Sequence, residues 1–164
     1  MPIVNEIQGD LIELAKAGEF DAIVHGCNCF HAMGAGIARS IAQEFPEAYK
    51  ADCETTHGEY GKLGDFSICV IDRFKEPFHV INAYTQYDMG RDGSYHAIKK
   101  VFQLINKIFK GQNIGIPLIG CGIAGLEWAS VRAIIDKECP DVDICVVHYR
   151  KDIPLNIMIE HLHS

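Results

Sequence analysis

Short apolar segments alternate with amphipathic helical patterns along this chain, and the alternation restricts its fold more than any other sequence feature. Segments 66–71, 78–83 and 113–119 have the apolar character and the length of strands. In 37–45 and 95–109, apolar residues recur every three or four positions, as they do on one face of a helix. Several strands are apolar on both faces, which is typical of a parallel sheet covered by helices on both sides. We therefore predict a three-layer α/β/α sandwich around a mixed, mostly parallel sheet.

The rest of the chain adds elements to the same unit. The other predicted elements are strands at 3–7, 21–25 and 144–147 and a helix at 128–139. The tail, residues 151–164, is expected to form a short helix. The sequence shows no internal repeat, low-complexity tract or linker, and 164 residues suit one folded unit. We therefore predict a single domain over residues 1–164.

Charge and cysteine content restrict the partners and the compartment. The chain has 15 Lys and Arg against 22 Asp and Glu, a formal net charge of -7, and no dense basic patch for a long polyanion. No apolar run reaches the roughly 20 residues that span a bilayer, and the first residues lack the pattern of a signal peptide. Seven cysteines are an odd number, which favours reduced thiols. We expect a cytoplasmic protein with no membrane partner.

Two glycine-rich loops each join an apolar strand to a helix. The first contains Gly34 and Gly36, and the second covers 120–125. Their spacing does not fit the dinucleotide-binding fingerprint, because Arg39 stands where the third glycine belongs. Backbone N–H groups at a helix start favour an anion by about 0.3–1 kcal/mol per charge. In a parallel sheet both loops would lie at the carboxyl ends of their strands and clamp a diphosphate; the alternative is two tight turns without a ligand.

These two loops and the Gly9-Asp10 dipeptide resemble the macrodomain family of ADP-ribose-binding modules. The resemblance runs from about Ile3 to about Tyr149. The segment from His25 to Ala38 is similar to that of the ADP-ribose 1″-phosphate phosphatase branch, and the late loop to that of the terminal ADP-ribose protein glycohydrolase group. The resemblance implies a macrodomain fold and a hydrolase that binds ADP-ribose and removes the terminal phosphate of ADP-ribose 1″-phosphate. The alternatives are removal of ADP-ribose from a modified macromolecule, and binding without catalysis.

The same resemblance implies a role for each matched position. Asp10 would accept a hydrogen bond from the adenine amino group, and it also has the position of a helix N-cap. Asn28 would bind the distal ribose; a turn-forming asparagine is the alternative. The backbone of both loops would enclose the diphosphate. The expected ligand-binding residues are Asp10, Leu11, Asn28, Gly34, Ala35, Gly36, Ile37, Gly120, Cys121, Gly122, Ile123, Ala124 and Gly125.

His25 is the catalytic candidate that the phosphatase branch implies, as a general acid or base at a strand end. A structural histidine bonded to neighbouring backbone is the alternative. The glycohydrolase branch uses a lysine and an aspartate. The segment that matches the lysine, residues 84–87, contains no lysine in this chain, and Ala124 stands where the aspartate would be. We therefore do not expect covalent chemistry on a lysine.

Two other arrangements of residues in the sequence could carry chemistry. The alternation of His25, Cys27, Cys29 and His31 suggests zinc, but an extended strand separates such side chains by about 6–7 Å, too far for one tetrahedral ion. Cys121 stands between glycines at a helix start, but the sequence identifies no base to activate it. We expect no metal and no cofactor.

Overall fold

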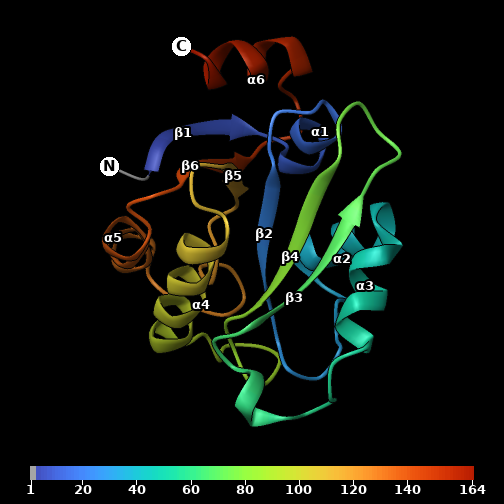
Figure 1. Ribbon diagram of the computed structural model, residues 1–164, viewed down its shortest axis with the longest axis vertical. Coiled ribbons are helices and arrows are strands. Elements are labelled where there is room, and N and C mark those ends of the chain that lie inside the picture. The colour runs from blue at the N-terminus through green and yellow to red at the C-terminus, as the bar shows by residue number, and fades with distance from the viewer. Residues whose placement is uncertain (1–2) are drawn as a thin grey trace.

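Six strands form one sheet in the order β1-β6-β5-β2-β4-β3 in the computed structural model, which describes residues 3–164. The strands are β1 (Ile3–Gly9), β2 (Ala22–Cys27), β3 (Phe66–Ile71), β4 (Phe78–Tyr84), β5 (Asn113–Ile116) and β6 (Asp143–Tyr149). Every neighbouring pair is parallel except β3 with β4, which are consecutive and antiparallel. The predicted mixed, mostly parallel sheet is confirmed, and Figure 1 shows its twist.

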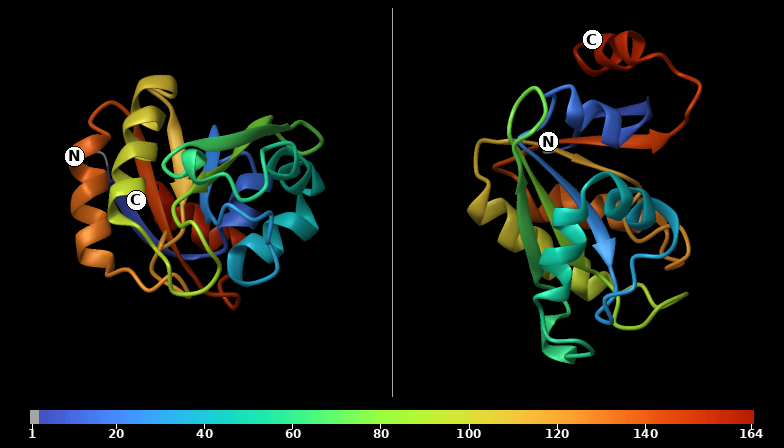
Figure 2. Two further views of the ribbon diagram at one scale, coloured as in Figure 1. Left: turned by 90° about the horizontal axis from the view of Figure 1, so that it is seen from below. Right: turned by 90° about the vertical axis from the view of Figure 1, so that its right-hand side faces the viewer.

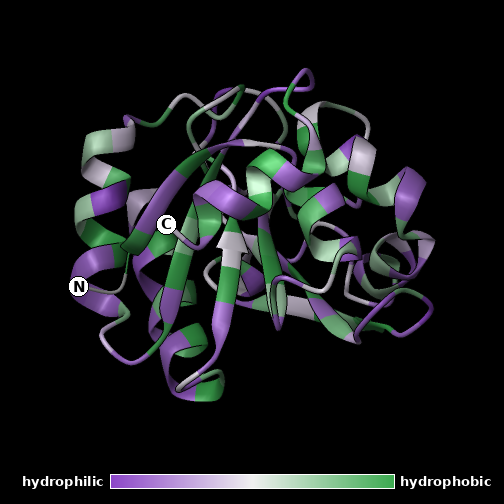
Figure 3. Cartoon of the chain, turned by 90° about the horizontal axis from the view of Figure 1, so that it is seen from above, coloured by the Kyte–Doolittle hydropathy of each residue, from purple (hydrophilic) through white to green (hydrophobic). Residues whose placement is uncertain are grey.

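Helices cover both faces of this sheet. They are α1 (Leu11–Lys16), α2 (Gly36–Glu44), α3 (Pro46–Cys53), α4 (Tyr95–Ile108), α5 (Trp128–Glu138) and α6 (Leu155–Leu162), with a 3-10 helix η1 at Tyr60–Lys62. Helices α4 and α5 pack on one face, and α1, α2, α3 and α6 pack on the other (Figure 2). Each helix shows bands of both hydrophobic and hydrophilic colour, as a helix that buries one side requires (Figure 3). The predicted three layers are therefore confirmed.

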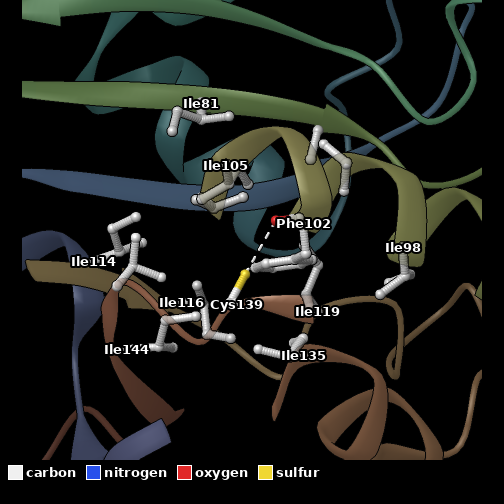
Figure 4. Close-up of a cluster of buried hydrophobic side chains, with 14 of the residues drawn as sticks. Ile81, Ile98, Phe102, Ile105, Ile114, Ile116, Ile119, Ile135, Cys139 and Ile144 are labelled. Carbon is white, nitrogen blue, oxygen red and sulfur yellow. Dashed lines mark hydrogen bonds between the residues drawn. The ribbon is translucent and has the colours of Figure 1, made fainter. Parts of the chain in front are cut away.

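The core under α4 follows directly from the spacing of its apolar residues. Ile98, Phe102 and Ile105 lie on one side of α4 and are fully buried against the central strands. Cys139 follows α5 and packs among them, where its thiol donates a hydrogen bond to the carbonyl of Phe102 (Figure 4). Cys139 thus acts as a small core residue, as a cysteine in an apolar run suggests.

Two prolines change the predicted boundaries. The segment predicted as a strand at 113–119 is a strand only to Ile116, because Pro117 has no N–H group to donate to the next strand. Pro46 ends the first long helix, but it also stands in the first turn of α3, where its missing N–H costs nothing. The chain therefore gains a helix, α3, that the sequence pattern did not predict.

The C-terminal tail contains α6, which packs against β1 and α1. Met158 of this helix is buried, and its sulfur accepts a hydrogen bond from the backbone N–H of Asp10 at 3.2 Å. The tail therefore contacts the residue that begins α1. Within residues 3–164, no helix has both the length and the apolar character needed to cross a membrane.

Candidate functional site

The carboxyl ends of the parallel strands surround one cavity of about 940 Å³. Its lining includes Asp10 after β1, Gly26 in β2, Thr85 after β4, Pro117 after β5 and Tyr149 at the end of β6. Both glycine loops line it as well, so the structure brings together the two segments that the sequence analysis paired. This volume is in the range of sites for small-molecule ligands.

The first loop offers uncapped backbone amides to the cavity. Ala35 is the N-cap residue of α2, and among residues 3–164 no side chain accepts a hydrogen bond from the first turn of this helix. Gly36 has a φ of +58°, a left-handed conformation that favours glycine. A Cβ added at Gly34 would meet nothing within 4 Å, so the space in front of it is open. The start of α2 is therefore a suitable place for an anion.

The second loop is held by its own backbone. The N–H of Leu126 donates to the carbonyl of Gly120 at 2.9 Å, and that of Gly125 donates to Gly122 at 3.1 Å. Within residues 3–164, the amides of Ile123 and Ala124 donate to no backbone or side-chain acceptor. The lining includes residues 120–124 but not Gly125, which faces the side chain of Arg91 instead. This loop thus presents free N–H groups from a braced turn.

Asp10 lies at one end of the cavity and caps α1. Its Oδ1 accepts hydrogen bonds from the backbone N–H groups of Ile12 at 3.0 Å and Glu13 at 3.3 Å. Its Oδ2 has no hydrogen-bond partner within the part of the chain that the structure describes. The capping role is confirmed, and one carboxylate oxygen stays available to a ligand. Leu11, the next residue, also lines the cavity.

Asn28 lines the cavity and holds the first loop in shape. Its Oδ1 accepts from the N–H groups of Phe30 and Ala32, and its Nδ2 donates to the carbonyl of Ala32 at 2.9 Å. The turn-forming role that the sequence analysis left open is therefore confirmed. One of the two Nδ2 hydrogens has no partner in the part of the chain that the structure describes, so the same side chain can still donate to a ligand.

His25 lies outside the lining of the cavity. The side chain is fully buried, and its Nε2 lies 2.7 Å from Oδ1 of Asn82 on the neighbouring strand β4. Because Nδ2 of Asn82 donates to the carbonyl of Ala48, its Oδ1 is the acceptor and Nε2 of His25 carries the proton. Burial lowers the pKa of His25 to about 4, and the hydrogen bond to Asn82 opposes this only in part. The ring is therefore neutral at pH 7, and its catalytic role stays a prediction.

A chain of buried polar side chains continues from His25 beneath α3. Asn82 also donates to Oγ of Ser67, which lies 2.8 Å from the hydroxyl of Tyr84. That hydroxyl donates to a carboxylate oxygen of Asp52 at 2.7 Å. Burial raises the pKa of Tyr84 well above its ordinary value, so the phenol stays protonated and can donate this bond. The network fixes β2 and β4 directly below their carboxyl ends.

The alternating His and Cys side chains after β2 point to different partners. The thiol of Cys29 donates to the carbonyl of Gln86, while Nε2 of His31 lies 3.1 Å from Oγ1 of Thr55. Cys121 lines the cavity, and burial raises the pKa of its thiol, which disfavours the nucleophilic thiolate. Within residues 3–164, no three His, Cys, Asp or Glu side chains come together as a metal site would require.

The sequence analysis missed several lining residues at the strand ends. Thr85 and Gln86 follow β4, Met89 and Gly90 belong to the next loop, and Tyr149 ends β6. The signal was available, because ligands of parallel sheets bind at the carboxyl ends of strands whether or not a glycine stands there.

The charge of the lining is negative. It includes the carboxylates of Asp10, Glu13 and Glu44, and within residues 3–164 it contains no Lys, Arg or His. Glu44 is paired with Lys16 at 2.8 Å. An anionic ligand would therefore depend on backbone N–H groups inside the cavity.

Comparisons with known proteins agree with this geometry. The Macro domain family model matches residues 24–135. The chain is 32% identical over 154 residues to the "uncharacterized 17.5 kDa protein in tk-vs intergenic region" of Enterobacteria phage T4, covering 90% of this chain and 97% of that protein. It is 25% identical over 147 residues to an ADP-ribose 1″-phosphate phosphatase of Lodderomyces elongisporus, covering 82% and 91%.

A solved structure shares the fold over the whole chain. It is Thermosipho africanus DarTG in complex with ADP-ribose, with a TM-score of 0.68 and 17% sequence identity. The match covers 100% of this chain and 47% of that chain. At this identity the likeness shows the fold alone.

Proposed function

Because this chain belongs to the Macro domain family, we propose that it binds ADP-ribose and hydrolyses the terminal phosphate of ADP-ribose 1″-phosphate. One observation carries the binding proposal: both glycine loops present free backbone amides to a single cavity. Such amides bind a diphosphate without a cation in the lining, as helix starts and tight turns do in other phosphate sites.

The two ends of the cavity suit the two ends of this ligand. The unpartnered Oδ2 of Asp10 can accept a hydrogen bond from an amino group on adenine. The remaining Nδ2 hydrogen of Asn28 can donate to a hydroxyl of the distal ribose. The diphosphate then lies between Gly34 and Gly122, where the structure leaves open space. This orientation uses the free carboxylate oxygen of Asp10 and the free amide hydrogen of Asn28.

The phosphatase reaction is favoured by a relative of that name, 91% of whose length this chain covers. We assign proton transfer to His25 from the family resemblance. Its neutral ring has an unprotonated Nδ1, as a general base requires. Since the ring is buried against Asn82, contact with the substrate requires it to turn toward the cavity.

Removal of ADP-ribose from a modified macromolecule is the competing reaction. A lysine nucleophile is missing from the lining within residues 3–164, where Thr85 and Gln86 follow β4 and Ala124 lies in the second loop. This reaction would need another group in the cavity. Assays of both reactions distinguish the two.

Calorimetric titration with ADP-ribose tests the binding proposal first. Gly122→Glu should weaken binding at least about tenfold, or about 1.4 kcal/mol, because the new carboxylate enters open space beside the diphosphate. Gly61→Glu is the matched control, since Gly61 lies outside the lining and has an ordinary backbone conformation. Absence of ADP-ribose binding by the unmodified protein would overturn the proposal.

Phosphate release from ADP-ribose 1″-phosphate tests the reaction. His25→Gln keeps a donor for Asn82 and should keep ADP-ribose affinity while turnover falls by roughly 10²–10⁴-fold. Unchanged turnover in this variant would show that His25 is structural. Release of ADP-ribose from a modified protein or nucleic acid, without phosphate release, would favour the competing reaction. Binding with neither activity would leave a module that only recognises ADP-ribose.

A further inference from the structure

The cavity and the proposed substrate are poorly matched in charge. The lining includes three carboxylates, of which Glu13 and Glu44 pair with Lys16, and within residues 3–164 it includes no cationic side chain. Amides of the two loops are suited to the diphosphate, but ADP-ribose 1″-phosphate also carries a terminal phosphate with a charge of about -1.5 to -2 at neutral pH. Proteins commonly bind such a group with arginine, whose planar guanidinium forms two parallel hydrogen bonds to it. A cation close to the cavity would correct this mismatch.

The loop that contains Arg91 lies at the Asn28 end of the cavity. The N–H of Cys29 donates to the carbonyl of Tyr87 at 2.9 Å, which joins the start of this loop to the residue after Asn28. The N–H of Gly93 donates to the carbonyl of Ala124 at 3.0 Å, which joins its other end to the second glycine loop. Met89 and Gly90 line the cavity between these two attachments. Arg91 follows directly; it is outside the lining, and its side chain lies against Gly125 beside the second glycine loop.

The side chain of Arg91 lies across Gly125. A Cβ built on Gly125 would come within 2.7 Å of Cγ and 3.1 Å of both Nε and Cζ of Arg91. Gly125 therefore leaves the room in which the arginine side chain packs. Its φ of +83° also disfavours any side chain there. The guanidinium is thus placed beside the loop that presents free amides to the cavity.

Within residues 3–164, no carboxylate forms an ion pair with this arginine. Asp88 and Asp92 flank it in sequence, but Oδ2 of Asp92 accepts from the N–H of Asp88, and Oδ1 of Asp88 accepts from the N–H of Met89. Throughout residues 3–164, the guanidinium of Arg91 has no ion pair and no hydrogen bond, and the side chain is exposed. All five of its N–H donors are available to a ligand.

We propose that Arg91 binds the terminal phosphate of ADP-ribose 1″-phosphate and thereby sets a preference for this compound over ADP-ribose. The inference rests on the proposed function, because adenine at Asp10 and the distal ribose at Asn28 direct the terminal group toward Arg91. The guanidinium is a binding group in this role, and it also offsets the negative charge of the lining as the phosphate enters.

The test compares two ligands in matched variants. Arg91→Met keeps the aliphatic stem over Gly125 and removes the charge, while Arg91→Lys keeps the charge without the two-pronged geometry. Arg73→Gln removes one positive charge at the β3–β4 turn, where Arg73 pairs with Glu47. The measured quantities are Kd for ADP-ribose, and KM for ADP-ribose 1″-phosphate, or Kd where it is not hydrolysed.

Arg91→Met should weaken the binding of ADP-ribose 1″-phosphate about tenfold or more, and the binding of ADP-ribose less than about twofold. Arg91→Lys should bind ADP-ribose 1″-phosphate more weakly than the unmodified protein does and more tightly than Arg91→Met does. Arg73→Gln should change neither. An equal loss for both ligands in Arg91→Met would show that the residue only supports the loop, and no loss for either would also overturn the inference. Either of these two outcomes leaves the proposed function intact, because the unmodified protein still binds ADP-ribose. If it does not, the proposed function fails and this inference fails with it.

Discussion

Both faces of the sheet carry a buried apolar cluster, but the face beneath α3 also contains a chain of hydrogen-bonded polar side chains. Against α4 and α5, side chains such as Phe102 pack with the aliphatic residues of the central strands. Beneath α3, His25 and Asn82 begin a chain of hydrogen bonds that reaches Asp52. Apolar contacts are non-directional, whereas hydrogen bonds fix the positions of the groups they join. The comparison suggests that the first face supplies stability and that the second holds β2 and β4 in place below the cavity.

The largest expected effect is on the apolar face. Phe102→Ala should lower the free energy of unfolding by about 4 kcal/mol, because Phe102 is fully buried and its removal leaves a cavity. Urea denaturation measures this change. If Phe102 mattered only for stability, ADP-ribose affinity would stay unchanged wherever the variant is folded. A loss below about 1 kcal/mol would contradict the assignment of stability to this face.

The polar face should make stability depend on pH. Folding lowers the pKa of His25 from 6.5 to about 4, so the unfolded chain binds a proton in this range and the folded chain does not. The stabilisation is present above pH 6.5 and is lost as the pH falls toward 4, in total about 3 kcal/mol. Urea titrations of the natural chain and of His25→Gln from pH 7 to pH 4 should therefore differ in slope. Parallel curves would show that His25 takes up its proton in the folded protein as well.

A smaller effect is expected where the polar network is cut at its centre. Asn82→Ala should cost about 2 kcal/mol, because the buried Nε2–H of His25 loses its acceptor. Asn156→Ala is the matched control on an exposed position of α6 and should stay within about 0.5 kcal/mol. If the folded Asn82→Ala protein also binds ADP-ribose more weakly, this would support the view that the polar network positions the strand ends. Equal stability of the two variants would break it.

The smallest effect concerns a single polar contact on the otherwise apolar side. Ser94 caps α4, with its Oγ accepting from the N–H of Ala97 at 3.1 Å. Ser94→Ala should lower the free energy of unfolding by about 1 kcal/mol, and Ser94→Asp should retain most of the stabilisation that Ser94 provides. Thermal unfolding of the three proteins gives the comparison. Equal stability of all three would mean that packing of α4 alone sets its beginning.

The fold was predictable where the sequence pattern fits only one kind of secondary structure. The stripe of α4 has only a helical interpretation, and the strands at β3 and β4 begin at the predicted residues. Helix α3 was missed because Pro46 ends one helix and starts another, and a sequence pattern does not separate the two roles.

The parts of the site that depend on backbone conformation were predictable, whereas the parts that depend on the direction of a side chain were less so. The glycine loops were found because their backbone turns at Gly36, Gly120 and Gly125 have a positive φ, which favours glycine. The direction of His25 was not predictable, because β2 is buried on both faces and its alternation gives no preferred side. Tyr149 was missed because the prediction followed the glycine loops and left out the other carboxyl ends of the parallel strands.

The contact between Met158 and Asp10 has a consequence for biosynthesis. It joins residues 148 positions apart, and β1 has β6 as its only strand neighbour in residues 3–164. The part of the cavity that Asp10 lines therefore stays incomplete on the ribosome until β6 and α6 have emerged. Ligand binding at this end of the cavity depends on contacts between segments that are far apart in the sequence, so it cannot precede the docking of β6 and α6 on β1.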